Sequence, residues 1–73
     1  MTSYNEVIRN LSTIEINYIQ YMLYKLGYGC MITGTWDHPT NSALILFQKT
    51  AGLRCDGIPT KDVLDLLKKQ LNK

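Results

Sequence analysis

The sequence predicts an all-α fold: a compact three-helix orthogonal bundle with a pseudo-twofold internal repeat, and with a short extra helix as an option at the N-terminus. Apolar residues recur at the three- and four-residue spacing of a helical face in three separate stretches. Glycines punctuate these stretches, and helix-capping residues precede them. No segment alternates apolar and polar residues for long enough to form a strand.

The length and composition of the chain argue against two classes of function, nucleic-acid binding and membrane spanning. The chain has 73 residues, of which 45% are hydrophobic and 19% charged, as expected for one small globular domain. The net charge of +2 is too small to indicate a nucleic-acid-binding protein. No apolar run approaches the roughly 18 residues that a membrane span needs. We therefore expect a monomer with neither nucleic acid nor membrane as its partner.

Residues 1–11 form an N-terminal lead-in. Tyr4, Val7 and Leu11 share one helical face, which predicts a short helix ending near Asn10. The remaining residues, 12–73, form the main domain.

The first main helix has the clearest start. Ser12 and Glu15 match the capping box, in which each side chain accepts a hydrogen bond from the other residue's backbone N–H. Gly27 supplies the left-handed residue that ends the helix. Its apolar stripe comprises Ile19, Met22, Leu23 and Leu26.

Two further helices follow. Pro39 predicts the first turn of the second helix, with Asp37 or His38 as its N-cap and Thr40 bracing the turn. Gly52 ends this helix, and Thr60 is the expected N-cap of the last one. The inward residues of these helices are Ala43, Leu44 and Phe47, and then Val63, Leu64, Leu67 and Leu71.

A degenerate internal repeat links the two turns. Each unit reads helix, glycine, bulky apolar residue, any residue, cysteine, short loop and a second glycine, over 27–34 and again over 52–57. The repeat implies two similar halves around one core. The two cysteines, Cys30 and Cys55, are too few for a disulfide framework, so we expect reduced apolar side chains, with a single bridge as the alternative.

Together these residues resemble the peptidoglycan-binding domain family, a small three-helix cell-wall-binding module of wall hydrolases and endolysins. The resemblance covers most of the chain, from about Ile14 to Leu67. Thr33 and Asp37 depart from the family's pattern in the first turn. The matching blocks are Leu23, Leu26, Gly27 and Tyr28; then Gly34 and Trp36; then Thr40, Ala43, Leu44, Phe47 and Gln48; then Gly52, Leu53, Asp56, Gly57 and Ile58.

The resemblance implies non-catalytic binding of bacterial cell-wall peptidoglycan (muropeptide) through a shallow cleft between the 29–38 loop and the start of the second helix. Trp36 supplies an aromatic face for stacking, or else plugs the end of the core. Asn41 is expected to point outward, where its amide reaches a ligand. The candidate ligand-binding residues are Tyr28, Thr33, Trp36, Asp37, His38, Asn41 and Arg54. We expect no catalytic residue, metal or cofactor, because lone His38 has no second positioned group beside it.

The alternative is a protein–protein adaptor, or a phage structural or regulatory component, that reuses the fold without wall binding. Tyr21 and Tyr24 are expected at edge or outward positions, and an exposed tyrosine patch suits a protein partner or a saccharide. A DNA-binding helix-turn-helix is disfavoured, since the second and third helices carry few basic residues in their first turns. No secretory signal is visible, so we expect cytoplasmic synthesis, with action at the wall after release by lysis or from a virion, or in the cytoplasm as an adaptor.

Overall fold

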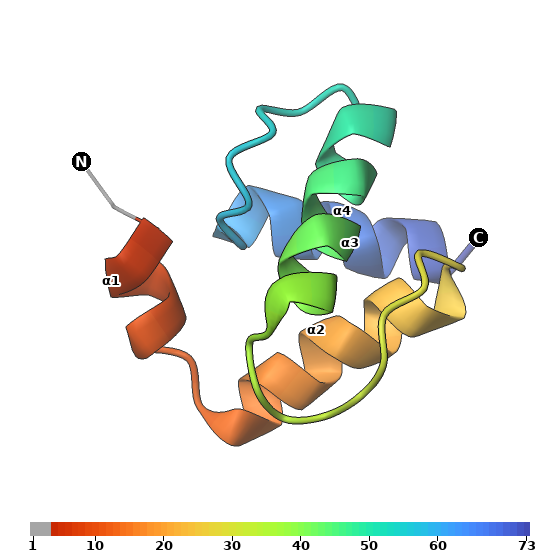
Figure 1. The fold of residues 1–73 in the computed structure, drawn as a ribbon. Coiled ribbons are helices and arrows are strands. Elements are labelled where there is room, and N and C mark those ends of the chain that lie inside the picture. Colours follow the sequence, from red (N-terminus) through yellow and green to blue (C-terminus); the bar gives the residue numbers. More distant parts are fainter. Residues whose placement is uncertain (1–3) are drawn as a thin grey trace.

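The computed structural model describes residues 4–73, which contain four helices and no strand. The helices are α1 (Tyr4–Arg9), α2 (Thr13–Lys25), α3 (His38–Thr50) and α4 (Lys61–Leu71). α2 packs against both α3 and α4, and α3 crosses the other two steeply (Figure 1). The all-α prediction is confirmed, and the short extra helix at the N-terminus is present as α1.

The helix boundaries follow from local capping. Ser12 and Glu15 form the reciprocal capping box at the start of α2, at 3.2 and 3.0 Å. Asp37 is the N-cap of α3, where its carboxylate accepts from the Thr40 backbone N–H. Thr60 occupies the N-cap position of α4, without a side-chain cap bond.

The predicted repeat appears in the way α2 and α3 end. Gly27 and Gly52 both adopt positive φ angles, of 87° and 75°. After α2, Tyr28 N–H donates to the Leu23 carbonyl, and after α3, Leu53 N–H donates to the Gln48 carbonyl. Both ends are therefore Schellman motifs, which explains why the same glycine and bulky apolar pair occurs twice.

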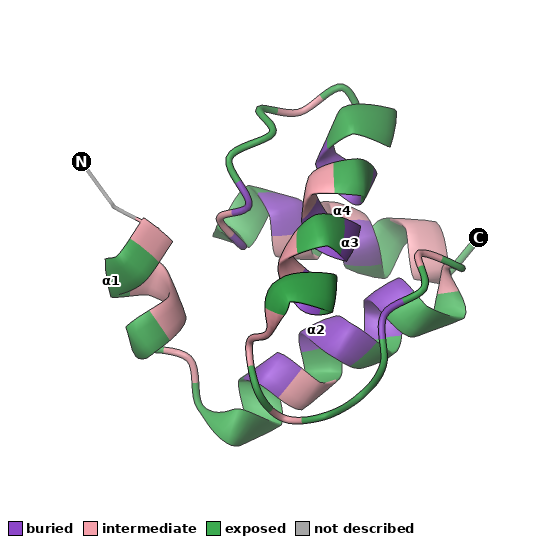
Figure 2. Ribbon diagram, in the orientation of Figure 1, coloured by how far each residue is buried: buried purple, intermediate pink, exposed green. Residues whose placement is uncertain are grey.

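One apolar core joins the three longer helices. Its buried residues lie on α2, α3 and α4, with Cys30 in the loop after α2, whereas α1 has none (Figure 2). Nine buried residues make up this cluster: Ile19, Met22, Leu23, Cys30, Ala43, Leu44, Phe47, Val63 and Leu67. Leu11, Tyr28, Trp36 and Leu53, among others, pack around its edge.

Candidate functional site

The loop before α3 is held by a buried glutamine of α2. Gln20 is fully buried, and its Oε1 accepts from the backbone N–H groups of Thr33 and Gly34, both at 2.9 Å. Its Nε2 lies 2.8 Å from Thr40 Oγ1 and 2.9 Å from the Thr35 carbonyl. The side-chain amide of Gln20 therefore holds the loop from its centre. Both its oxygen and its nitrogen have hydrogen-bond partners, as a buried amide requires.

Asp37 completes this network. Its Oδ1 accepts from the hydroxyl and the backbone N–H of Thr40, and its Oδ2 lies 3.1 Å from Thr33 Oγ1. The Thr40 hydroxyl bond, helped by the bonds from Thr40 N–H and Thr33, holds the pKa of the Asp37 carboxyl below its usual value. Thr40 braces the turn as predicted. The polar groups of Thr33 and Asp37 thus form hydrogen bonds that hold the loop and the start of α3 together.

Trp36 and Asn41 have polar atoms turned into the protein. Trp36 is half-buried against the core. Among residues 4–73, neither its indole Nε1–H nor Asn41 Oδ1 has a hydrogen-bond partner, although both atoms are buried. The expected outward orientation of Asn41 is wrong, because the Gly57 turn folds back over this face of α3: a Cβ built on Gly57 would lie 2.7 Å from Asn41 Oδ1. His38 is exposed at the first position of α3.

The turn after α3 repeats the glutamine arrangement. Gln48 is buried, and its Oε1 accepts from Gly57 N–H at 2.9 Å while its Nε2 donates to Asp56 Oδ1 at 3.0 Å. Asp56 Oδ1 also accepts from Ile58 N–H at 2.9 Å, which forms an Asx-type turn. The Ile58 bond, with Gln48 and nearby Arg54, lowers the pKa of the Asp56 carboxyl.

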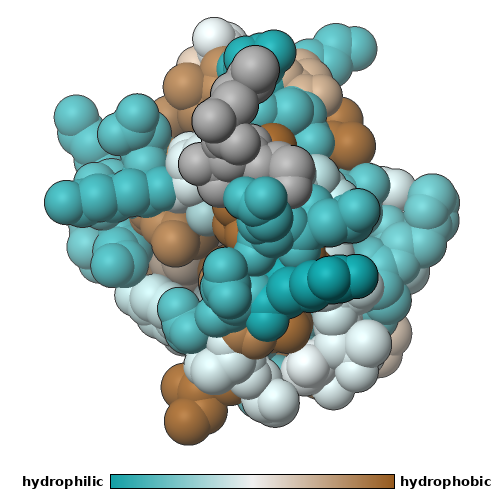
Figure 3. Space-filling model, turned by 90° about the vertical axis from the view of Figure 1, so that its left-hand side faces the viewer, coloured by the Kyte–Doolittle hydropathy of each residue, from teal (hydrophilic) through white to brown (hydrophobic). Residues whose placement is uncertain are grey.

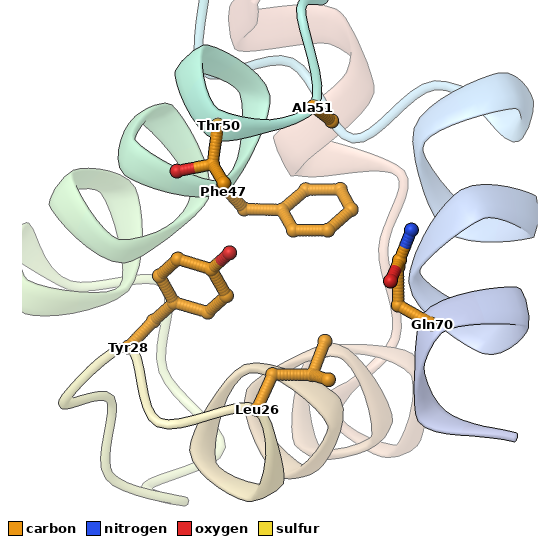
Figure 4. Close-up of a pocket in the computed structure, with 6 residues that line it drawn as sticks. All are labelled: Leu26, Tyr28, Phe47, Thr50, Ala51 and Gln70. Carbon is orange, nitrogen blue, oxygen red and sulfur yellow. The ribbon is translucent and has the colours of Figure 1, made fainter. Parts of the chain in front are cut away.

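A pocket opens at the other end of the bundle, between the C-terminal ends of α2 and α3 and the last turns of α4. We call it the Tyr28 pocket. It measures about 130 Å³, and the side chains of Leu26, Tyr28, Phe47 and Gln70 surround a common space, from which the Thr50 oxygen is turned away (Figure 4). The Tyr28 ring packs edge-on against Phe47, with centroids 5.8 Å apart and an interplanar angle of 89°. The lining residues are Leu26, Tyr28, Phe47, Thr50, Ala51 and Gln70.

A second hollow, of about 250 Å³, lies between the 53–60 turn and the start of α4. Arg54, Asp56 and Asp62 give it both signs of charge. The seven predicted site residues therefore lie in different parts of the structure and do not form one site. Tyr28 lines the first pocket, Arg54 lines the second hollow, and neither lining includes Thr33, Trp36, Asp37, His38 or Asn41.

Sequence reasoning missed three side chains that matter here. Gln20 carried a signal, since it follows Ile19 on the inward face of a helix, where an amide must find partners. Thr50 and Gln70 carried none, because nothing local distinguishes them from solvated residues at helix ends.

The part of the chain that the structure describes offers few groups for metal binding, membrane insertion or thiol chemistry. Residues 4–73 hold no group of three or more potential metal ligands, and none of their helices is long and apolar enough to cross a bilayer. Cys30 is buried and Cys55 exposed, and both are free. Burial raises the pKa of the Cys30 thiol.

Some apolar side chains remain exposed. Ile14 and Met31 are 80% and 72% exposed, and Tyr18, Tyr21 and Tyr24 also reach solvent. On the side that carries α1, hydrophobic residues appear as separate patches among hydrophilic ones (Figure 3).

The comparisons with known proteins agree with this architecture. The sequence model of the peptidoglycan binding domain matches residues 14–67, which span α2, α3 and most of α4, with both glycine turns. No curated protein sequence and no solved structure shows significant similarity to the chain. The match covers well over half of the sequence, and the chain belongs to the peptidoglycan binding domain family.

Proposed function

We propose that this domain binds bacterial cell-wall peptidoglycan without catalysis, and that the Tyr28 pocket receives the muropeptide. The observation that carries the proposal is the composition of this pocket. Leu26, Phe47 and Ala51 supply apolar surface, and the polar groups of Tyr28, Thr50 and Gln70 border it. Ligand sites in proteins commonly combine an apolar lining with a few polar groups that fix orientation.

The cleft predicted from the sequence is the competing location. Its polar members are engaged within the fold, since Thr33 and Asp37 bond to the Gln20 network and Asn41 lies under the Gly57 turn. Contact of Trp36 or His38 with a ligand stays a prediction. A Trp36→Ala variant tests the contact of Trp36, because it removes the aromatic face that would stack on a ligand.

The proposed mechanism is simple adhesion. A pocket this small buries little ligand surface, so we expect a Kd between about micromolar and millimolar. Binding of that strength raises the local concentration of any activity attached to or associated with the domain. None of the six lining residues is an Asp, Glu, His, Cys or Lys, and Tyr28 is the one lining side chain that could transfer a proton.

Co-sedimentation with washed peptidoglycan sacculi tests the proposal. Ala51→Leu fills the pocket with a larger apolar side chain, and Arg54→Gln changes the second hollow instead. We expect saturable pelleting that Ala51→Leu lowers at least fivefold and that Arg54→Gln leaves unchanged. A folded protein that pellets with no sacculus would overturn wall binding and direct the search to a protein partner by affinity capture.

A further inference from the structure

The Tyr28 pocket has no charged side chain in its lining. The six residues are three apolar side chains, one phenol, one hydroxyl and one carboxamide. A ligand carboxylate entering this space would lose hydration without meeting a cation, which is unfavourable. The ligand group that fits is therefore uncharged.

The polar groups of the pocket have unused hydrogen-bonding capacity of both kinds. The Thr50 hydroxyl donates to the Leu46 carbonyl at 3.0 Å and is turned away from the space in Figure 4, so Gln70 Oε1 is the atom left to accept from a ligand N–H. Within residues 4–73, neither the Tyr28 hydroxyl nor the Gln70 side-chain amide has a hydrogen-bond partner, so both can donate to a ligand carbonyl. A group with one N–H and one C=O matches this set, whereas a carboxylate only accepts.

The apolar part of the lining adds a second requirement. In Figure 4 the Phe47 ring and the Leu26 side chain lie on opposite sides of the space, with Tyr28 and Gln70 between them. A small alkyl group placed there is removed from water by Leu26, Phe47 and Ala51. Burial of one methyl group strengthens binding about fourfold.

Resting on the proposed function, we infer that the Tyr28 pocket binds a neutral secondary amide that carries a methyl group, and that it discriminates against free carboxylates. Peptidoglycan presents this chemistry in two places: the N-acetyl groups of its sugars and the alanyl peptide bonds of its stem peptides. Both sources place a methyl beside an amide, and the experiment must separate them.

NMR titrations of the ¹⁵N-labelled full chain test the inference. The sugar pair is methyl N-acetyl-β-glucosaminide and methyl β-glucoside, which differ in the acetamido group. The peptide pair is acetyl-alanyl-alanine as its amide and as its free acid, which differ in the terminal charge. We expect one or both of the neutral amide probes to shift the backbone signals of Tyr28, Ala51 and Gln70. We expect the glucoside to bind at least fivefold more weakly than its partner. We expect the free acid, which keeps the same internal amides, to bind no more tightly than the amide.

Two matched variants connect these shifts to the pocket. Tyr28→Phe removes the donating hydroxyl and Gln70→Leu removes the amide, each with little change in volume. We expect each variant to weaken the neutral probe at least fivefold, and Arg54→Gln to leave it unchanged. Raising NaCl from 50 to 500 mM should alter the affinity less than twofold, because no ion pair is involved.

The outcomes separate this inference from the proposed function. Tighter binding of the free acid, or loss of binding in Arg54→Gln, would overturn the inference and indicate a charged ligand group. Sacculi that pellet the protein while neither neutral amide shifts the pocket signals would overturn the inference and leave wall binding intact. Failure of the wild-type chain to pellet with any sacculus would overturn both.

Discussion

Gln48 accepts a hydrogen bond from the backbone N–H of Gly57 across 2.9 Å, and this contact ties the second turn to α3. Gln20 does the same for the first turn through Gly34, also at 2.9 Å. Each glutamine is buried and lies on the helix that precedes its turn. The two halves of the fold therefore repeat a hydrogen bond from a turn glycine to a buried glutamine, as well as the glycine that ends each helix.

Replacing Gln20 should destabilise the whole domain. Gln20→Met keeps the volume but leaves the N–H groups of Thr33 and Gly34 without their partner. Unsatisfied groups of this kind cost about 2–4 kcal/mol in total, which is most of what a domain this small has. We expect Tm, measured by circular dichroism, to fall by about 10 °C or more. Gln70→Met is the matched control, and equal melting temperatures for the two variants would show that the Gln20 network is dispensable.

The glycines at 52 and 57 offer a comparison of backbone strain with steric contact. Both have positive φ, of 75° and 71°, so alanine at either site costs about 1–2 kcal/mol in strain. Gly52 has nothing within 4 Å of its added Cβ, whereas Gly57 has Asn41 Oδ1 at 2.7 Å. We expect Gly57→Ala to be the more destabilising change in urea unfolding.

Asn41 supplies the second half of that comparison. Asn41 Oδ1 is the atom that the added Cβ of Gly57→Ala would clash with. Asn41→Ala should therefore restore the extra unfolding free energy lost in Gly57→Ala, and it should not rescue Gly52→Ala. Purely additive effects in the double variants would contradict the packing of Asn41 under the Gly57 turn.

Acid should weaken the fold through its two bonded aspartates. The pKa of the Asp37 carboxyl is lowered by the Thr40 hydroxyl bond, and that of Asp56 by the Ile58 backbone bond. A carboxyl whose folded pKa is depressed stabilises the protein above its unfolded pKa of about 4. That contribution is lost as the pH falls through the folded value. Tm should thus be flat above pH 5 and should fall as the pH drops below about 4.

Asp37→Asn tests the assignment of this acid sensitivity. Asparagine also caps helices, so the variant keeps the start of α3 while it removes the titrating group. We expect a shallower fall in Tm below pH 4 than in the parent protein. An identical pH profile for parent and variant would assign the acid sensitivity to other carboxyl groups.

Much of the fold was predictable because its determinants are local. The Ser12 and Glu15 capping box and the glycines at 27 and 52 mark helix ends by short-range hydrogen bonds and φ preference. The bracing by Gln20 was not predictable from spacing, since its partners lie 13 to 20 residues away.

The site was less predictable than the fold. Tyr28 was identified from the glycine-tyrosine pair of the family pattern, and it lines the pocket. Thr50 and Gln70 join it only because α3 and α4 end on the same side of α2, a consequence of packing that no local motif records. Asn41 was expected at the surface, and the long-range return of the Gly57 turn covers it.

Co-sedimentation of the wild-type chain and its Ala51→Leu variant with peptidoglycan sacculi tests the central claim most directly. Trp36→Ala and Arg54→Gln accompany them, and circular dichroism checks that each variant is folded. We predict saturable pelleting of the wild type, at least fivefold weaker pelleting of Ala51→Leu, and near-normal pelleting of Arg54→Gln. Normal pelleting of Ala51→Leu, with loss in Trp36→Ala, would contradict the Tyr28 pocket and place the ligand at the loop before α3.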